Sequence, residues 1–355
     1  MAAAVPLIRS LPDCTDFSKV VQPYLPQLYA LPQQFLHSAT NLDDLKQLYV
    51  STNPLIFAFA FSLALAPIFL VLSEINKNYS QVDRCWSILP TIYNIHYDVW
   101  AHMNGLPAYR LDNVVAFSTL WSLRLTFNYW RKGGYKIGVE DYRWEIIRGK
   151  VHPALFFIFN VTFIATIQSV LLFTITTPTY LLLLASRATA TNTLTPSDTV
   201  FVRTLMSLIL LTFFADQQQW DYQNAKASYR QTARPTQRFS AAQLERGFVT
   251  SGLWRWSRHP NFAAEQAIWV GLYQWGCWAT ETYWNWTGVG ALGYLILFQG
   301  STWFTEIVSK GKYEEYAEYQ RRVGRFLPKV ALTGFEGWDE DEVKEERKRK
   351  GKKKE

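Results

Sequence analysis

The sequence predicts an all-α integral membrane protein, a polytopic bundle of about seven transmembrane helices. Three observations support this: several long apolar runs, abundant Trp and Tyr, and basic residues gathered in particular loops. A helix crosses the bilayer core with about 20 predominantly apolar residues. The fifteen Trp and nineteen Tyr fit an interfacial aromatic belt, because both residue types are enriched where lipid meets water.

Residues 1–54 precede the first predicted span. They are rich in Pro, Gln and Tyr and show little periodicity. They also lack the basic start and compact apolar core of a cleavable signal peptide. We expect this segment to be poorly ordered or to lie on the surface.

Five runs have the length and composition of a membrane span, and two weaker runs complete the count. The five are Leu55–Leu72 (kinked at Pro67), Ala154–Thr176, Thr199–Ala215, Asn261–Ala279 and Trp284–Phe304, and the weaker two are Trp86–Trp100 and Asn113–Trp130. The run Leu181–Ala185 after Pro178 is too short to span and extends the preceding helix.

The loop charges predict the orientation, because Lys and Arg accumulate on the cytoplasmic side of a membrane. The segments 131–150 and 220–258 are rich in both, whereas Ser186–Ser197 holds only Arg187. With about seven spans, this places the N-terminus in the lumen and the C-terminus in the cytoplasm. We therefore expect a seven-helix membrane domain over 55–328 and a charged cytoplasmic tail over 329–355.

The tail carries Lys352 and Lys353 at the fourth and third positions from its end. This pattern matches the dilysine retrieval signal of endoplasmic-reticulum membrane proteins, an address read by coat proteins rather than an anchor. The alternative is a solvated Lys-rich tail that ends this way by chance. We expect an endoplasmic-reticulum membrane protein without a nucleic-acid partner, because a basic run lacking a folded module is only an electrostatic patch.

Arg124 lies well inside the apolar stretch of the third span. An Arg at the centre of a membrane helix costs about 2.5–3.5 kcal/mol on insertion scales, so such residues usually face a polar cavity. A phosphate-bearing ligand entering from the cytoplasm would pair with it. Alternatively, the span starts later and the Arg124 side chain extends to the cytoplasmic surface.

Arg258, His259 and Pro260 precede the sixth span. Pro suits the first turn of a helix, and a helix N-terminus favours phosphate or carboxylate beside the two basic residues. Asn261 and Glu265 are four residues apart and share one helix face. A basic anchor at the membrane surface explains Arg258 equally well but leaves Glu265 unexplained.

Three further groups place polar or aromatic side chains at the membrane boundary. Asp216 closes the fifth span and precedes three Gln residues, a set that suits hydroxyl or amide ligands. Tyr316 and Tyr319 lie one helical turn apart after the seventh span, where an interfacial aromatic belt is the alternative. Asp83 and Trp86 lie at the mouth of the second span, which we assign to the substrate side.

Several familiar motifs are absent from the sequence. It has no G-x-G-x-x-G after a strand and no G-x-x-x-x-G-K-S/T, so any dinucleotide is not held by a Rossmann domain or P-loop. The three Cys residues are far apart, and the five His residues form no H-E-x-x-H motif. We therefore expect no disulfide framework and no metal site.

Seven short motifs occur in an order that resembles one protein family. They are Asn78–Trp86, Trp121–Leu125, Glu140–Trp144, Ala215–Gln218, Gly252–Trp254, Arg258–Glu265 and Tyr316–Tyr319, followed by a terminal Leu327-Pro328. The set is similar to the DUF1295 branch of the steroid 5α-reductase-like superfamily over residues 74–328. The isoprenylcysteine carboxyl methyltransferase-like membrane proteins share part of the pattern.

This resemblance implies a seven-helix membrane fold with NADPH bound in a cavity open to the cytoplasm. The implied reaction reduces a carbon–carbon double bond conjugated to a carbonyl in a lipid or sterol. Hydride goes to the β-carbon while a proton donor polarises the carbonyl oxygen. The expected cofactor-binding residues are Arg124, Asp216, Arg258, His259, Asn261, Glu265, Tyr316 and Tyr319. Tyr93 and Tyr97 are candidate proton donors by location alone.

The chain departs from the superfamily's usual Asn-Tyr-Phe-Gly-Glu, which here reads Asn261-Phe262-Ala263-Ala264-Glu265. Two alternatives to the reductase stay open. One is a membrane methyltransferase using S-adenosylmethionine, which Asn261 and the Asp216 group disfavour. The other is a non-catalytic lipid-binding or scaffolding protein of the same fold, which Phe262 and the two alanines favour.

Overall fold

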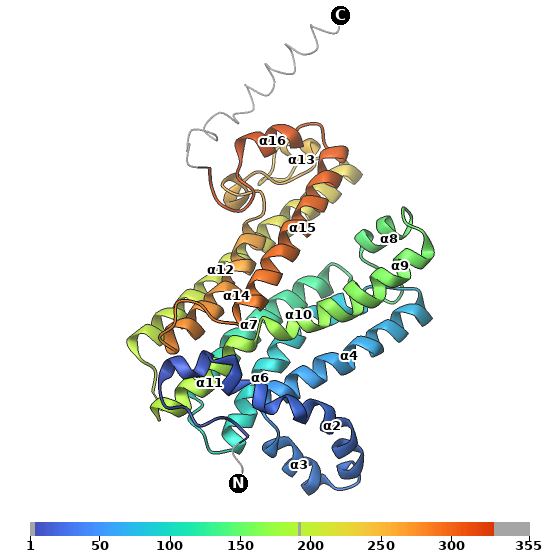
Figure 1. Ribbon diagram of the computed structural model, residues 1–355. Coiled ribbons are helices and arrows are strands. Elements are labelled where there is room, and N and C mark those ends of the chain that lie inside the picture. The colour runs from blue at the N-terminus through green and yellow to red at the C-terminus, as the bar shows by residue number, and fades with distance from the viewer. Residues whose placement is uncertain (1–3, 191–192, 330–355) are drawn as a thin grey trace, which may run out of the picture. The chain divides into compact units, whose positions relative to one another are not determined.

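The computed structural model describes residues 4–190 and 193–329, and every regular element within these ranges is a helix (Figure 1). The all-α prediction is therefore confirmed. Residues 330–355, with the proposed signal at Lys352 and Lys353, lie outside the described part of the chain.

The chain divides into two compact units, which we describe separately. Unit 1 comprises Met1–Ser207 and Ile268–Leu295, and unit 2 comprises Leu208–Ala267 and Ile296–Glu355. The division falls inside the region 55–328 that we expected to form one membrane domain.

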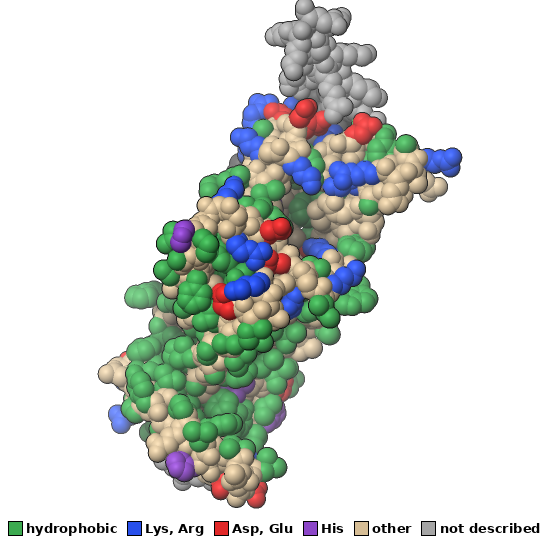
Figure 2. Space-filling view, turned by 90° about the vertical axis from the view of Figure 1, so that its right-hand side faces the viewer, with side chains coloured by type: hydrophobic (Ala, Val, Ile, Leu, Met, Phe, Trp, Pro, Cys, Tyr) green, Lys and Arg blue, Asp and Glu red, His purple; other side chains and the backbone are tan. Residues whose placement is uncertain are grey.

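Three described helical stretches are long and apolar enough to cross a membrane: Pro54–Asn76, Pro153–Thr189 and Pro196–Thr232. They contain three of the predicted spans, and their composition indicates a membrane protein. Hydrophobic side chains also cover much of the face in Figure 2. Helix α4 (Pro54–Asn76) exposes Ile68 and Val71. The count of seven spans and the orientation remain predictions.

Unit 1 begins with five short helices, at residues where we expected poor order or a surface position. They are η1 (Leu11–Thr15), α1 (Phe17–Val20), η2 (Gln22–Tyr24), α2 (Leu25–Ser38) and α3 (Leu42–Ser51). The last two are largely exposed, which fits the surface alternative. The segment before them is anchored instead, because the Tyr180 hydroxyl donates to the Val20 carbonyl at 2.9 Å and Arg187 donates to the Val5 carbonyl at 2.9 Å.

Unit 1 continues with the helices between residues 54 and 189. They are α4, α5 (Gln81–Trp86), α6 (Leu89–Met103), α7 (Tyr109–Arg131), α8 (Tyr142–Arg148), α9 (Pro153–Phe159), the π-helical segment η3 (Asn160–Ile167), α10 (Gln168–Thr174) and α11 (Thr177–Thr189). The short run after Pro178 extends the preceding helical stretch as α11. Helices α6 and α7 pack against each other.

Unit 2 contains helices that surround the start of the predicted sixth span. They are the part of α12 (Pro196–Thr232) after Ser207, α13 (Ala241–Arg246), η4 (Gly252–Arg255), the first turns of α14 (Pro260–Ala279), the second part of α15 (Gly288–Lys312) and α16 (Tyr316–Arg322). Helix α14 begins at Pro260, as the sequence predicts. Helix α12 continues far beyond the predicted end at Ala215, because residues 216–232 contain neither Gly nor Pro and are rich in good helix formers.

Candidate functional site

Two of the sequence motifs meet on α12 in unit 2. The Gln218 side-chain oxygen accepts a hydrogen bond from the Leu253 amide at 2.9 Å, and the Trp254 indole donates to the Ala215 carbonyl at 3.1 Å. Gly252 has a φ of +63°, and a Cβ there would lie 2.5 Å from the same Gln218 oxygen. Only glycine suits both the left-handed backbone and the close approach.

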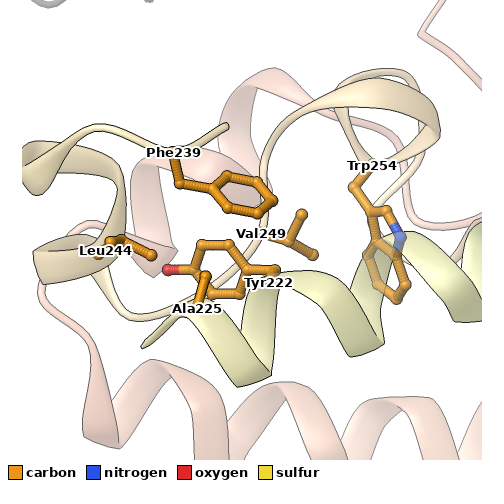
Figure 3. Packing of buried hydrophobic residues seen from close by; sticks show 6 residues of the cluster. All are labelled: Tyr222, Ala225, Phe239, Leu244, Val249 and Trp254. Carbon is orange, nitrogen blue, oxygen red and sulfur yellow. The ribbon is translucent and has the colours of Figure 1, made fainter. Parts of the chain in front are cut away.

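A hydrophobic cluster holds the segment 239–254 against α12 (Figure 3). Its buried members are Tyr222, Ala225, Phe239, Leu244, Val249 and Trp254. The rings of Tyr222 and Phe239 meet edge to face with centroids 5.4 Å apart, and the Tyr222 hydroxyl donates to the Gln243 carbonyl at 2.8 Å. This packing fixes the loop that carries Gly252 and Trp254.

The start of α14 presents the polar face that the sequence predicts. The Asn261 amide donates to the Asp216 carboxylate at 2.9 Å, which joins α14 to α12. Glu265 lies one turn further along and is only 5% exposed. Unit 2 therefore brings together Asp216 and Asn261, which are 45 residues apart in sequence, with Glu265 on the same helix.

The basic pair ahead of α14 is bound by a carboxylate that the sequence reasoning missed. Glu306 on α15 accepts from the Arg258 Nε at 2.7 Å and pairs with the His259 Nε2 at 3.0 Å. All three side chains are buried. Arg258 also donates to the carbonyls of Gln320 and Val323. The expected anion at this helix start is thus met within the protein by Glu306.

Backbone pairing holds the chain beside this network. Segments around Ser257 and Gly324 form an isolated parallel bridge, in which the Arg258 amide donates to the Gly324 carbonyl at 2.9 Å. The next amide, that of His259, donates to the Arg325 carbonyl at 3.1 Å. A Cβ on Gly324 would lie 1.9 Å from the Leu327 carbonyl oxygen, so this turn requires glycine.

The network sets the ionisation of its members. Burial raises the pKa of Glu306, but hydrogen bonds from His259 and Arg258 outweigh it and lower that pKa to about 2. Burial lowers the pKa of His259, against the opposing effect of Glu306. Glu306 is therefore the fixed negative charge that holds Arg258 in place.

Tyr316 and Tyr319 both point into unit 2 rather than forming an exposed belt. They are 5% and 2% exposed, and both rings pack against Phe248. The Tyr319 hydroxyl donates to the Trp254 carbonyl. Helix α16 is thereby attached to the same loop that contacts α12.

Unit 1 brings together two other motifs of the sequence. The Asp83 carboxylate accepts from the Trp144 indole at 2.7 Å, the Tyr79 amide donates to Glu140 at 2.8 Å, and the Asp141 amide donates to the Ser80 hydroxyl at 2.9 Å. Burial raises the pKa of Asp83, although the positive charge of Arg143 opposes this. The half-buried Trp86 stacks on Tyr294 with ring centroids 6.2 Å apart.

The remaining predicted residues also lie in unit 1. Arg124 on α7 is only 8% exposed. Tyr93 and Tyr97 on α6 are 1% and 0% exposed. The Tyr93 hydroxyl has no hydrogen-bond partner among the described residues, whereas the Tyr97 side chain interacts with Thr176. An unsatisfied buried donor costs about 1–3 kcal/mol, so the Tyr93 hydroxyl is the better placed of the two to donate to an oxygen of a ligand.

Comparison with known proteins places this arrangement in a family. A family model described as a protein of unknown function (DUF1295) matches residues 69–323. The chain is also 38% identical over 343 residues to an uncharacterized protein of Schizosaccharomyces pombe, covering 96% of this chain and 98% of that relative. No solved structure matches the chain. The region matched by the family model includes the motifs that meet at α12, α14 and α16 and those that join Asp83 to Trp144. The chain therefore belongs to the DUF1295 family.

Proposed function

We propose that this protein reduces a conjugated carbon–carbon double bond in a lipid or sterol, with NADPH, at the endoplasmic-reticulum membrane. The observation that carries the proposal is the polar seam of unit 2, defined as Asp216, Asn261 and Glu265. Its residues come from two helices, are linked by the 2.9 Å bond between Asn261 and Asp216, and include a buried carboxylate. Buried ionisable groups in a membrane protein mark functional sites by default.

The seam suits the neutral polar groups of NADPH. Carboxylates and a side-chain amide can accept from or donate to ribose hydroxyls and a carboxamide. Asn261 and Glu265 would hold these groups from α14, with Asp216 opposite on α12. Arg258 and His259 take a different role in the proposal, because Glu306 already binds both. They position the start of α14, and with it Asn261.

When bound, NADPH supplies the hydride that the side chains themselves cannot supply. The chain's own residues orient the reactants, exclude water and move a proton. The hydroxyls of Tyr93 and Tyr97 are the candidate proton donors, as their place in the sequence suggests. Donation from either to a carbonyl oxygen would draw electrons from the conjugated double bond, an effect typically worth about 10²–10⁴-fold in rate. Asp83 and Trp86 remain the proposed substrate-side residues, and Arg124 remains a proposed cofactor contact.

One observation favours a second candidate, a non-catalytic lipid-binding protein of the same fold. Phe262, which stands where the superfamily usually has Tyr, stacks on His259 with ring centroids 5.5 Å apart and meets Phe298 edge to face. The ring at this position therefore lacks the hydroxyl that a Tyr would carry. A scaffold would need the packing of unit 2 but not its polar seam.

The two candidates are separated by thermal stabilisation of the full-length protein in detergent. NADPH, S-adenosylmethionine and a sterol are added singly, since a ligand that binds the folded state raises the melting temperature. The proposal predicts a shift with NADPH that Glu265→Gln abolishes. Glu318→Gln, which changes a carboxylate on α16 outside the seam, keeps the shift. A shift with the sterol alone would favour the non-catalytic protein, and one with S-adenosylmethionine a methyltransferase.

A further inference from the structure

Unit 1 carries a cluster of metal-ligating side chains at the junction of α6 and α7. Asp98 and His102 lie four residues apart in the last turns of α6, and Asp112 lies in the first turn of α7. One ligand atom from each residue can be chosen so that all three lie within 4.8 Å of one another. The ligands come from two helices, which is why no spacing motif in the sequence reveals them.

The distances within the cluster suit a small divalent ion. The His102 Nε2 lies 2.9 Å from the Asp112 Oδ1 and 3.6 Å from the Asp98 Oδ1. Ligands held tetrahedrally around zinc at about 2.0–2.2 Å are separated from one another by roughly 3.4 Å. The two observed separations lie on either side of that value, so small side-chain movements would complete the coordination.

The surroundings of Asp98 provide a second reason to expect a cation. Its Oδ1 is buried and makes no hydrogen bond among the described residues; the His102 Nε2 lies 3.6 Å away, and another carboxylate lies beside it. Burying a carboxylate oxygen without a donor is unfavourable. The His102 and Asp112 side chains are 57% and 44% exposed, so an ion can reach the cluster from solvent.

We propose that Asp98, His102 and Asp112 form a zinc-binding site that braces the α6–α7 junction. The imidazole nitrogen favours zinc over calcium and magnesium, which prefer oxygen ligands. Three protein ligands leave the fourth position for water. The proposed site departs from our expectation from sequence that no metal is bound. It rests on its own residues and does not depend on the proposed reductase activity.

The test uses the full chain in detergent, carrying an affinity tag without histidines. The protein is loaded with zinc, dialysed against metal-free buffer and analysed for bound metal, and the affinity is then measured by titration. We expect about one zinc ion per chain. His102→Gln and Asp112→Asn should each weaken binding by about 100-fold or more, because changes even behind the ligands typically cost 10–100-fold.

Both substitutions change exposed side chains, so we expect the fold to be retained. His37→Gln, an exposed histidine on α2, is the matched control and should bind zinc as the parent does. Cobalt uptake should give the absorption bands of a tetrahedral site in the parent but not in His102→Gln. Absence of zinc from the parent, or equal uptake by His102→Gln, would overturn the proposal.

Discussion

Glu306 contacts the basic side chains around the start of α14: Arg258, His259 and, at 3.6 Å, Arg325. Sequence reasoning identified Arg258 and His259 but not their partner. Glu306 is a single acid two residues beyond the predicted span Trp284–Phe304, and nothing nearby in sequence pairs with it. Individual site residues could thus be predicted where a local sequence pattern marked them, as for Asn261 and Glu265. A partner on another helix, such as Glu306, could not.

Glu306→Gln should lower the free energy of unfolding by about 3–5 kcal/mol, because it leaves Arg258 buried without its counter-charge. The Arg258 and Glu306 side chains are 8% and 4% exposed. Thermal unfolding in detergent measures the loss. Glu318→Gln is the control, since its partners Arg321 and Arg322 are 73% and 27% exposed and pairs open to solvent contribute about 0–1 kcal/mol. Equal effects of the two changes would contradict the assignment.

The low pKa of Glu306 predicts a dependence of stability on pH. A carboxyl whose pKa falls from 4.5 when free to about 2 when folded stabilises the folded state above its unfolded pKa. This stabilisation, on the order of 3 kcal/mol, is lost as pH falls from about 5 to about 2. Unfolding at stepped pH should show a steeper acid loss in the parent than in Glu306→Gln. Parallel curves would show that Glu306 is not the responsible group.

At the scale of elements, helix starts were more predictable than helix ends. Pro260 marked the start of α14 because proline fits the first helical turn. The end of α12 was placed at Ala215, where the apolar run stops, yet the helix continues to Thr232. Hydropathy reports where a helix leaves an apolar environment and not where its backbone hydrogen bonds cease. The pairing of Asp83 with Trp144 also depends on tertiary contacts that no local pattern reveals.

The bridge between Ser257 and Gly324 gives a prediction at this scale. Gly324→Ala should destabilise unit 2 by about 1–3 kcal/mol, because its Cβ would collide with the Leu327 carbonyl oxygen and the loop must shift. Gly311→Ala on α15 meets nothing within 4 Å and should instead be neutral or stabilising, since Ala favours helix. Melting temperatures in detergent compare the two, and an unaffected Gly324→Ala would refute the steric account.

For the whole molecule, the sequence was sufficient to predict an all-α membrane protein and its family. Three helices confirm the apolar character. The division into two units was not predicted, because α12, α14 and α15 each read as continuous elements while contacts change along them. Hydropathy identifies candidate spans, but it does not predict which other helices the side chains of each span contact.

The tail supplies a prediction about location. Replacing Lys352 and Lys353 with Ser in an N-terminally tagged protein should release it from the endoplasmic reticulum, because the signal is read at defined distances from the C-terminus. Lys348→Ser with Lys350→Ser removes the same charge at other positions and should leave location unchanged. Fluorescence microscopy against a reticulum marker distinguishes them. Retention of both variants would contradict a dilysine signal.

The central claim is that the polar seam Asp216, Asn261 and Glu265 binds NADPH. The most direct measurement is an equilibrium titration of NADPH into the detergent-purified chain, with Glu265→Gln and the control Glu318→Gln run in parallel. Loss of hydrogen bonds to a charged group costs about 1.5–3 kcal/mol, so Glu265→Gln should weaken binding by roughly 10- to 150-fold while Glu318→Gln binds as the parent does. No saturable binding by the parent, or equal affinity in Glu265→Gln, would contradict the account.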